Sequence, residues 1–136
     1  MAIGDILNGV PRLPRGELLV QIVTDKAYVD LPYVTVKKTK MEYIDYPIVR
    51  ICALRASDGI RTAFSGVSAI PFRSHRIEQV LNDTSVPLEQ RVDNAIRMWP
   101  VPILDDILSS AAYRTFVLQG ALTEVMEKLE LDRRGT

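Results

Sequence analysis

The clearest pattern of apolar and polar positions in the chain lies in residues 110–129. Apolar side chains recur there at intervals of three and four residues, the spacing that places them on one face of an α-helix. The positions that share this face are Leu118, Ala121, Leu122, Val125, Met126 and Leu129. We therefore predict a long helix with this face buried, and we expect Tyr113 and Val117 to extend the face toward the N-terminus.

Small residues define the start and the middle of this predicted helix. Ser109 or Ser110 is expected to cap its first turn, because a serine hydroxyl accepts a hydrogen bond from a backbone N–H that lacks a helical partner. Gly120 lies in mid-helix, where glycine costs about 1 kcal/mol relative to alanine. We therefore expect a second backbone to pass close to Gly120.

The first half of the chain contains short runs of β-branched and apolar residues, which favour strands. The segments expected to be strands are residues 17–23, 33–37, 48–54 and 60–65. Residues 48–54 are apolar at nearly every position, so they are predicted to form the central strand. Asp58-Gly59 lies between the last two segments and predicts a hairpin turn. The pattern predicts an antiparallel meander.

The periodicity then changes from that of strands to that of helices. A turn-rich crossover at residues 66–73 leads to a short helix that Ser74 is expected to cap. Pro87 opens a second, amphipathic helix that ends before Pro100. Strands followed by helices are typical of an α+β two-layer sandwich. We predict a three- to four-stranded antiparallel sheet followed by three helices.

The length of 136 residues fits one domain. Residues 1–16 are irregular and rich in glycine and proline, so we expect them to be a lead-in or linker. Residues 17–131 are expected to form the single α+β domain, and residues 132–136 a frayed tail.

Composition argues against several classes of function. The 17 basic and 17 acidic side chains give a formal net charge of zero, which argues against a nucleic-acid partner. No apolar run approaches the roughly 20 residues of a membrane span, and the N-terminal residues lack the pattern of a signal peptide. One cysteine and one histidine argue against disulfides and zinc clusters. We expect a cytoplasmic protein with no metal site.

The candidate catalytic residues each have a structural explanation that we favour. Asp105 and Asp106 are adjacent, so they do not face each other as an acid/base pair would, and capping of the turn before the last helix is expected instead. His75 has no nucleophile or carboxylate partner evident in the sequence and is expected to be solvated. Cys52 lies inside the predicted central strand and is expected to be buried. Trp99 is expected in or near the core.

Lys37, Lys38 and Lys40 form the one basic cluster in the sequence. The cluster can be a solvated strand end, which composition alone favours. It can also contact an anionic group such as a cofactor phosphate, because an ammonium group at a strand end is a usable point charge.

Three segments in a fixed order resemble one known family. Lys37 is followed by a polar stretch and DYPIV at residues 45–49, SGVSAIPFR occupies residues 65–73, and DDILSSAAYR occupies residues 105–114. These motifs are similar to those in the C-terminal domain of the FAD-binding (medium) subunit of molybdenum hydroxylases, the carbon monoxide dehydrogenase and xanthine dehydrogenase family. The likeness extends from about residue 16 to residue 129, nearly the whole chain.

The resemblance implies a role in electron transfer. In this family a molybdenum centre hydroxylates the substrate, and electrons pass through iron–sulfur clusters to FAD. The C-terminal domain closes one side of the flavin site, and the implied partners are an N-terminal FAD-binding domain, an iron–sulfur subunit and a molybdenum subunit. By the matching positions, Lys37 would lie near the flavin and Asp45 would help to hold the start of its strand.

Two departures from the family pattern qualify what the resemblance implies. The glycine-rich FAD-binding half is not in this sequence, so FAD would be held only together with a separate N-terminal domain, and none is expected for this chain alone. Met41 and Glu42 stand where many members carry two arginines. In the family, the strand expected at residues 17–23 has neighbouring strands that are not in this sequence. Its edge or apolar surface would therefore be exposed, which predicts self-association, such as a homodimer. The alternative function is a free-standing, non-catalytic α+β interaction or assembly module.

Overall fold

The computed structural model describes residues 13–41 and 45–131. The chain divides into two compact units, Met1–Asp30 and Leu31–Thr136. Residues 1–12 of the predicted lead-in, Glu42 and the predicted tail at 132–136 lie outside the described residues.

The first unit contains one element in its described part, the 3-10 turn η1 (Lys26–Tyr28). The Asp25 carboxylate caps this turn by accepting the N–H of Ala27 at 2.9 Å. The strand predicted at residues 17–23 is wrong, because these residues belong to no described strand. Their apolar side chains are exposed instead: Leu18, Leu19, Val20, Ile22 and Val23. An apolar run forms a strand only where a second backbone supplies hydrogen-bond partners.

The second unit contains a four-stranded antiparallel sheet in which spatial order follows chain order. Its strands are β1 (Tyr33–Thr39), β2 (Pro47–Ala56), β3 (Gly59–Ser65) and β4 (Phe72–Arg73). The turn at Asp58-Gly59 joins β2 to β3. Gly59 adopts a φ of +128°, which residues other than glycine rarely adopt. The predicted hairpin and the central position of β2 are confirmed.

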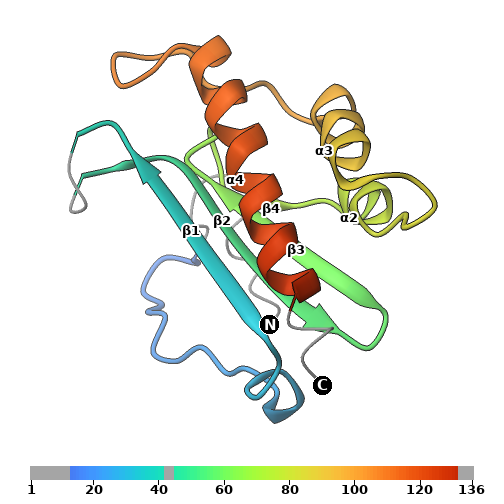
Figure 1. Ribbon diagram of the computed structural model, residues 1–136. Helices are drawn as coiled ribbons and strands as arrows, with labels where there is room; N and C mark the ends of the chain where they lie inside the picture. Colours follow the sequence, from blue (N-terminus) through green and yellow to red (C-terminus); the bar gives the residue numbers. More distant parts are fainter. Residues whose placement is uncertain (1–12, 42–44, 132–136) are drawn as a thin grey trace. The chain divides into compact units, whose positions relative to one another are not determined.

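Three helices complete the second unit: α2 (His75–Leu81), α3 (Leu88–Arg97) and α4 (Ala111–Leu131). Figure 1 shows α4 lying along the sheet, over β1 and β2, with α3 and α2 beside it on the same side. The predicted α+β class, with a four-stranded antiparallel sheet followed by helices, is confirmed. Among the described residues, no helix has the combination of length and apolarity that crossing a bilayer requires.

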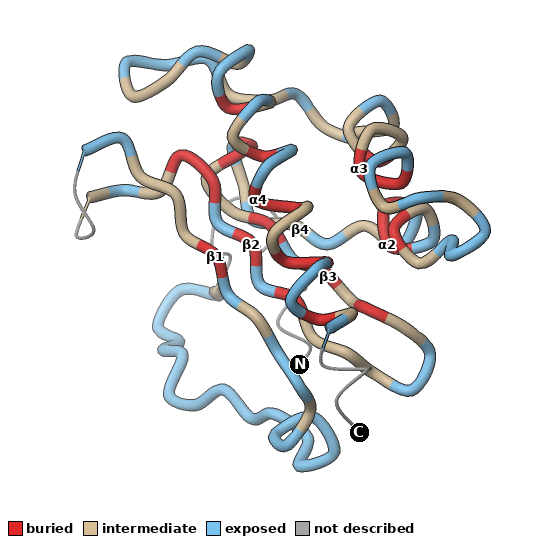
Figure 2. The backbone as a smooth tube through the Cα atoms, viewed as in Figure 1, coloured by how far each residue is buried: buried red, intermediate tan, exposed pale blue. Residues whose placement is uncertain are grey.

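The core lies between the sheet and α4 (Figure 2). All six residues of the predicted α4 stripe are fully buried, and they meet the inward side chains of β1, β2 and β3, which include Val36, Ile51 and Phe64. Trp99 packs edge-on against the rings of Phe64 and Phe72, with centroids 4.9 and 5.4 Å away, as a near-core position requires.

Two predictions about α4 are wrong. Tyr113 is 52% exposed, and the inward position in that turn belongs to Arg114, which is 1% exposed. Apolar periodicity misses this exchange because it assigns inward positions by hydrophobicity alone. Gly120 is exposed, and a Cβ atom built on it would meet nothing within 4 Å, so no other backbone within residues 13–41 and 45–131 passes close.

The Arg114 guanidinium ties three segments together beneath the first turn of α4. It donates to the carbonyl oxygens of Ile48 at 2.9 Å and Gly66 at 2.7 Å, and to the carboxylate of Asp106 at 2.6 Å. A buried cation is tolerated only when paired and hydrogen-bonded in this way. Burial raises the pKa of Asp106, but the hydrogen bond from Arg114 and those from the N–H groups of Ser109 and Leu108 outweigh it, so the pKa lies below its usual value.

Two further ion pairs hold the other helices. Arg91 of α3 is buried and donates to the carbonyl of Leu81 at 2.7 Å and to the carboxylate of Glu130 at 2.7 Å, which joins the ends of α2 and α4. Glu78 of α2 accepts the backbone N–H of Thr62 at 2.8 Å and pairs with Arg73 at 2.7 Å. Each helix is therefore fixed to its neighbours by a charge as well as by apolar contacts.

The predicted caps are confirmed. Ser74 accepts the N–H of Ile77 at the start of α2, and Ser110 accepts the N–H of Tyr113 at 3.2 Å at the start of α4. Asp105 accepts the N–H of Ala111 at 3.2 Å, so it serves the same helix start.

We expect Arg114→Met to lower the free energy of unfolding by about 3 kcal/mol, because removing one partner of a buried ion pair leaves the other uncompensated and here also leaves two buried carbonyls without donors. Urea unfolding checks this. Arg97→Met, at an exposed arginine of α3, is the matched control and is expected to change stability little. An equal loss in both variants would contradict the role assigned to Arg114.

We expect stability to fall with acid through Glu78. Burial raises the pKa of Glu78, but the hydrogen bonds from Arg73 and Thr62 and the charge of Arg73 outweigh it, so the folded pKa lies below the usual 4.5. The stabilisation is therefore fully present above about pH 4.5 and is lost as pH falls through the folded pKa.

Urea unfolding between about pH 6 and pH 3 measures this dependence. Glu78→Gln should show a smaller loss of stability on acidification than the wild type. Glu127→Gln, at an exposed position of α4, should follow the wild-type curve. The role of Glu78 is refuted if both variants follow that curve.

Candidate functional site

The face of the sheet that the helices leave uncovered carries the main concentration of described side chains with binding chemistry. Strand alternation places one set of residues from β1, β2 and β3 on this face, opposite the core side chains. We call this set the open face, and it consists of Tyr33, Thr35, Lys37, Arg50, Cys52, Leu54, Arg61 and Ala63. It contains three cations and no acidic residue.

Lys37 and Arg50 are direct cross-strand partners in the β1–β2 register. Side chains in such a pair have Cβ atoms about 5 Å apart, and two like charges so placed disfavour each other. Lys37 is half-buried, whereas Arg50 is exposed and makes no hydrogen bond or ion pair with the described residues. Arg61 lies on β3 and pairs with Asp58 at 3.0 Å. Arg50 is thus the cation of this pair that has no partner among the described residues.

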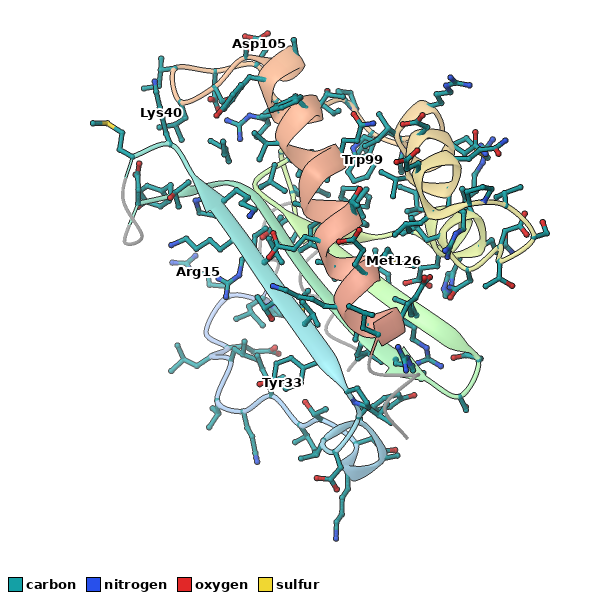
Figure 3. The ribbon with its side chains drawn as sticks, in the orientation of Figure 1. Arg15, Tyr33, Lys40, Trp99, Asp105 and Met126 are labelled. Carbon is teal, nitrogen blue, oxygen red and sulfur yellow. The ribbon has the colours of Figure 1, made fainter. Side chains whose placement is uncertain are left out.

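The structure separates the three lysines of the predicted basic cluster. Lys38 points to the helix side and pairs with Glu124 of α4 at 2.7 Å. Figure 3 shows Lys40 beyond one end of β1 and Tyr33 at the other end. Of the three lysines, Lys37 lies on the open face. The interpretation of the cluster as a solvated strand end fits Lys40, but it does not fit Lys38, which is paired with Glu124.

Asp45 lies two residues before β2, next to the segment that the structure does not describe. Its carboxylate accepts the N–H of Tyr46 at 2.8 Å. Lys37 lies further along the β1–β2 pair, opposite Arg50, so the two predicted site residues occupy different parts of the hairpin.

The prediction that Cys52 is buried is wrong. Cys52 is exposed on the open face, where the Thr35 hydroxyl lies 3.8 Å from its sulfur. β2 is covered by helices on one side only, so alternate residues of an apolar strand remain exposed. Among the described residues, no hydrogen bond joins the thiol to a base. His75 is solvated as predicted, with a side chain 83% exposed, but it does have a carboxylate neighbour, because its Nδ1 lies 3.4 Å from Oε2 of Glu78.

A hollow of about 690 Å³ lies at the far end of the β2–β3 hairpin. Its charged lining residues are Arg55, Asp58, Arg91 and Glu130, so the two signs balance. Neither this hollow nor the open face brings together a nucleophile and a base among the described residues. Among the residues that the structure describes, no group of three side chains that could hold a metal ion occurs.

The motifs at residues 45–49, 65–73 and 105–114 meet at Arg114, although Arg114 was not singled out from the sequence. The first supplies Pro47 and the Ile48 carbonyl, the second supplies Gly66, and the third supplies Asp106 and Arg114 itself. A Cβ on Gly66 would lie 2.6 Å from the Pro47 oxygen, and its φ is +77°, so glycine is required there. These motifs determine the fold; the open face is separate from their meeting point.

Comparisons with solved structures identify the same fold elsewhere. Quinoline 2-oxidoreductase from Pseudomonas putida 86 matches with a TM-score of 0.58 and 18% identity, over 73% of this chain and 36% of that chain. CO dehydrogenase from Oligotropha carboxidovorans matches with a TM-score of 0.56 and 18% identity, over 70% of this chain and 36% of that chain.

CO dehydrogenase from Hydrogenophaga pseudoflava, in a form that lacks the Mo-pyranopterin moiety of the molybdenum cofactor, matches with a TM-score of 0.54 and 17% identity, over 71% of this chain and 35% of that chain. The chain thus spans about a third of the length of these structures. At this identity the likeness establishes a shared fold. No family model and no curated protein matches the sequence.

We expect Cys52 to react with a thiol reagent in the native state, at a rate within about tenfold of that of a free cysteine, because its side chain is exposed. Absorbance after mixing with Ellman's reagent measures the rate. A reaction that requires denaturant would show that the open face is covered in solution.

Proposed function

We propose that this chain is the C-terminal domain of an FAD-binding subunit in a molybdenum, iron–sulfur and flavin oxidoreductase of the carbon monoxide or xanthine dehydrogenase type. The observation that carries the proposal is the shared fold with CO dehydrogenase and quinoline 2-oxidoreductase over 70–73% of the chain. The three ordered motifs support it independently, because they come from the sequence. In this proposal the domain closes one side of a flavin site and docks on the iron–sulfur and molybdenum subunits of a cytoplasmic complex.

The open face carries side chains that could contact parts of FAD. The pyrophosphate of FAD is anionic, and Lys37 and Arg50 place two cations side by side on adjacent strands. The flat flavin ring is largely apolar, and Tyr33 and Leu54 offer an aromatic and an apolar surface in the neighbouring part of the same face. Asp45 would act as a positioning residue at the start of β2, through its contact with the N–H of Tyr46.

The same residues do not suffice to hold FAD alone. Glycine-rich loops and helix N-termini usually cradle a dinucleotide pyrophosphate, and the sequence contains no GxGxxG pattern or adjacent glycines. We therefore propose that a separate N-terminal FAD-binding domain supplies most contacts. When bound, FAD would accept electrons and pass them on, while this chain orients the flavin and excludes water from one side.

Flavin retention with and without the N-terminal domain tests the proposal. The chain is mixed with FAD alone, and then with FAD and a separately produced N-terminal FAD-binding domain, and flavin fluorescence and co-elution are followed. We expect retention only when both proteins are present. Lys37→Ala and Arg50→Ala should each speed flavin loss by roughly tenfold, since each removes a charged contact.

Lys40→Ala is the matched control, because Lys40 is exposed beyond the end of β1 and off the open face. It should leave retention unchanged. If the two proteins do not co-elute and flavin is unaffected, the flavin-subunit proposal fails. A free-standing interaction or assembly module is then the better interpretation.

A further inference from the structure

The side of α4 that faces away from the sheet is largely apolar over its first ten residues, and its one polar residue, Gln119, donates its side-chain amide to Asp93 of α3 at 2.7 Å. We call this surface the α4 outer face, and it consists of Ala112, Tyr113, Phe116, Gln119 and Gly120, all exposed. Phe116 is 72% exposed and Tyr113 is 52% exposed, with their ring centroids 6.4 Å apart. Large aromatic side chains gathered on a helix surface in this way mark an interaction site.

Gly120 adds a second observation. Glycine is among the least favourable residues in a helix interior, and no contact in the described part of the chain compensates for it. Its φ is not positive, and a Cβ atom on it would meet nothing within 4 Å. A residue that no contact within the chain requires is explained if another molecule approaches the helix closely at that point.

The residues of the α4 outer face are placed symmetrically in sequence about Phe116. Ala112 and Gly120 lie four residues before and four residues after Phe116, while Tyr113 and Gln119 lie three before and three after. In an antiparallel pair of α4 helices centred on Phe116, Ala112 of each copy therefore faces Gly120 of the other, and Tyr113 faces Gln119. Small residues face small residues at both ends of the contact, and Phe116 meets its symmetry mate.

The charge distribution also permits self-pairing. Arg114 is the single charged residue of α4 before Gly120, and its guanidinium is buried and paired with Asp106. Charged residues resume in the second half of the helix, with Glu124 and Lys128 paired to each other. The first half of α4 therefore opposes no like charges in an antiparallel pair, and the carboxylate beside this face, Asp93 of α3, accepts the Gln119 amide.

We propose that the α4 outer face is a two-fold interface between copies of this chain. The proposal does not depend on the flavin function. The two aromatic rings contribute roughly 250 Å² of exposed surface per copy, which is a fraction of the roughly 800 Å² per partner in a stable interface. The dimer is therefore a reversible one that forms at high protein concentration.

Sedimentation velocity of the full chain, over concentrations up to about 1 mM, measures the association. Phe116→Lys and Phe116→Glu should each weaken it by at least about tenfold, because like charges would meet at the two-fold axis. An equimolar mixture of the two variants should restore association, since opposite charges would then face each other. A surface elsewhere on the molecule would give no such rescue.

Gly120→Ala supplies a second readout. The methyl group has open space in the monomer and alanine favours a helix, so the thermal midpoint of dilute protein should rise. The same methyl group would separate the paired helices, so association should weaken. A lower midpoint would mean that glycine is needed within the chain and would overturn the argument from Gly120.

Val20→Lys is the matched control, at an exposed apolar residue outside the second unit. It should leave association through α4 unchanged. The proposal is overturned if the wild type stays monomeric, if the mixed Phe116 variants fail to associate, or if Val20→Lys abolishes association. Binding of the N-terminal FAD-binding domain that is lost in Phe116→Lys, with the wild type otherwise monomeric, would assign the face to that partner instead.

Discussion

One buried charge organises the second unit. The Arg114 guanidinium loses its water on folding, and that loss is tolerated because two carbonyls and one carboxylate replace the water. Each replacement comes from a different part of the chain, so β2, the crossover after β3 and the loop before α4 must converge for the two Nη groups of Arg114 to form these hydrogen bonds. Apolar burial is non-directional, whereas these directed hydrogen bonds fix the first turn of α4 against the three segments.

The need to pair Arg114 also explains particular residues of the motifs and their spacing. Gly66 presents its carbonyl to Arg114 while its α-carbon lies against Pro47, so a side chain is excluded. Asp106 precedes Arg114 by eight residues because the loop must fold back across the first turn of the helix before its carboxylate reaches the guanidinium. The motifs that resemble a known family are thus the ones that build the fold, which agrees with the structural neighbours at 17–18% identity.

The two faces of the sheet are subject to different physical requirements. The helix side is apolar apart from groups with defined partners, such as Lys38 with Glu124, because buried charges need pairing. The open face carries Lys37 and Arg50 opposite each other without an acidic neighbour in the register, an arrangement that folding does not favour. The flavin proposal therefore assigns the contact with an anionic group to this face, while the shared fold and the motifs support the proposal as a whole.

The sequence alone determined the order of strands and helices, the α4 stripe, the hairpin at Asp58-Gly59 and the caps of α2 and α4, because these depend on periodicity and on local hydrogen bonds. It also pointed to Lys37 through a family resemblance. Tertiary structure decided what depends on neighbours far away in the chain. It placed Arg114 inward and Tyr113 outward, exposed Cys52 on the uncovered side of β2, left residues 17–23 without a strand partner, and set Arg50 beside Lys37. Composition and spacing do not specify which face a helix layer will cover or where a distant carbonyl will meet a cation, since both follow from packing of the whole chain.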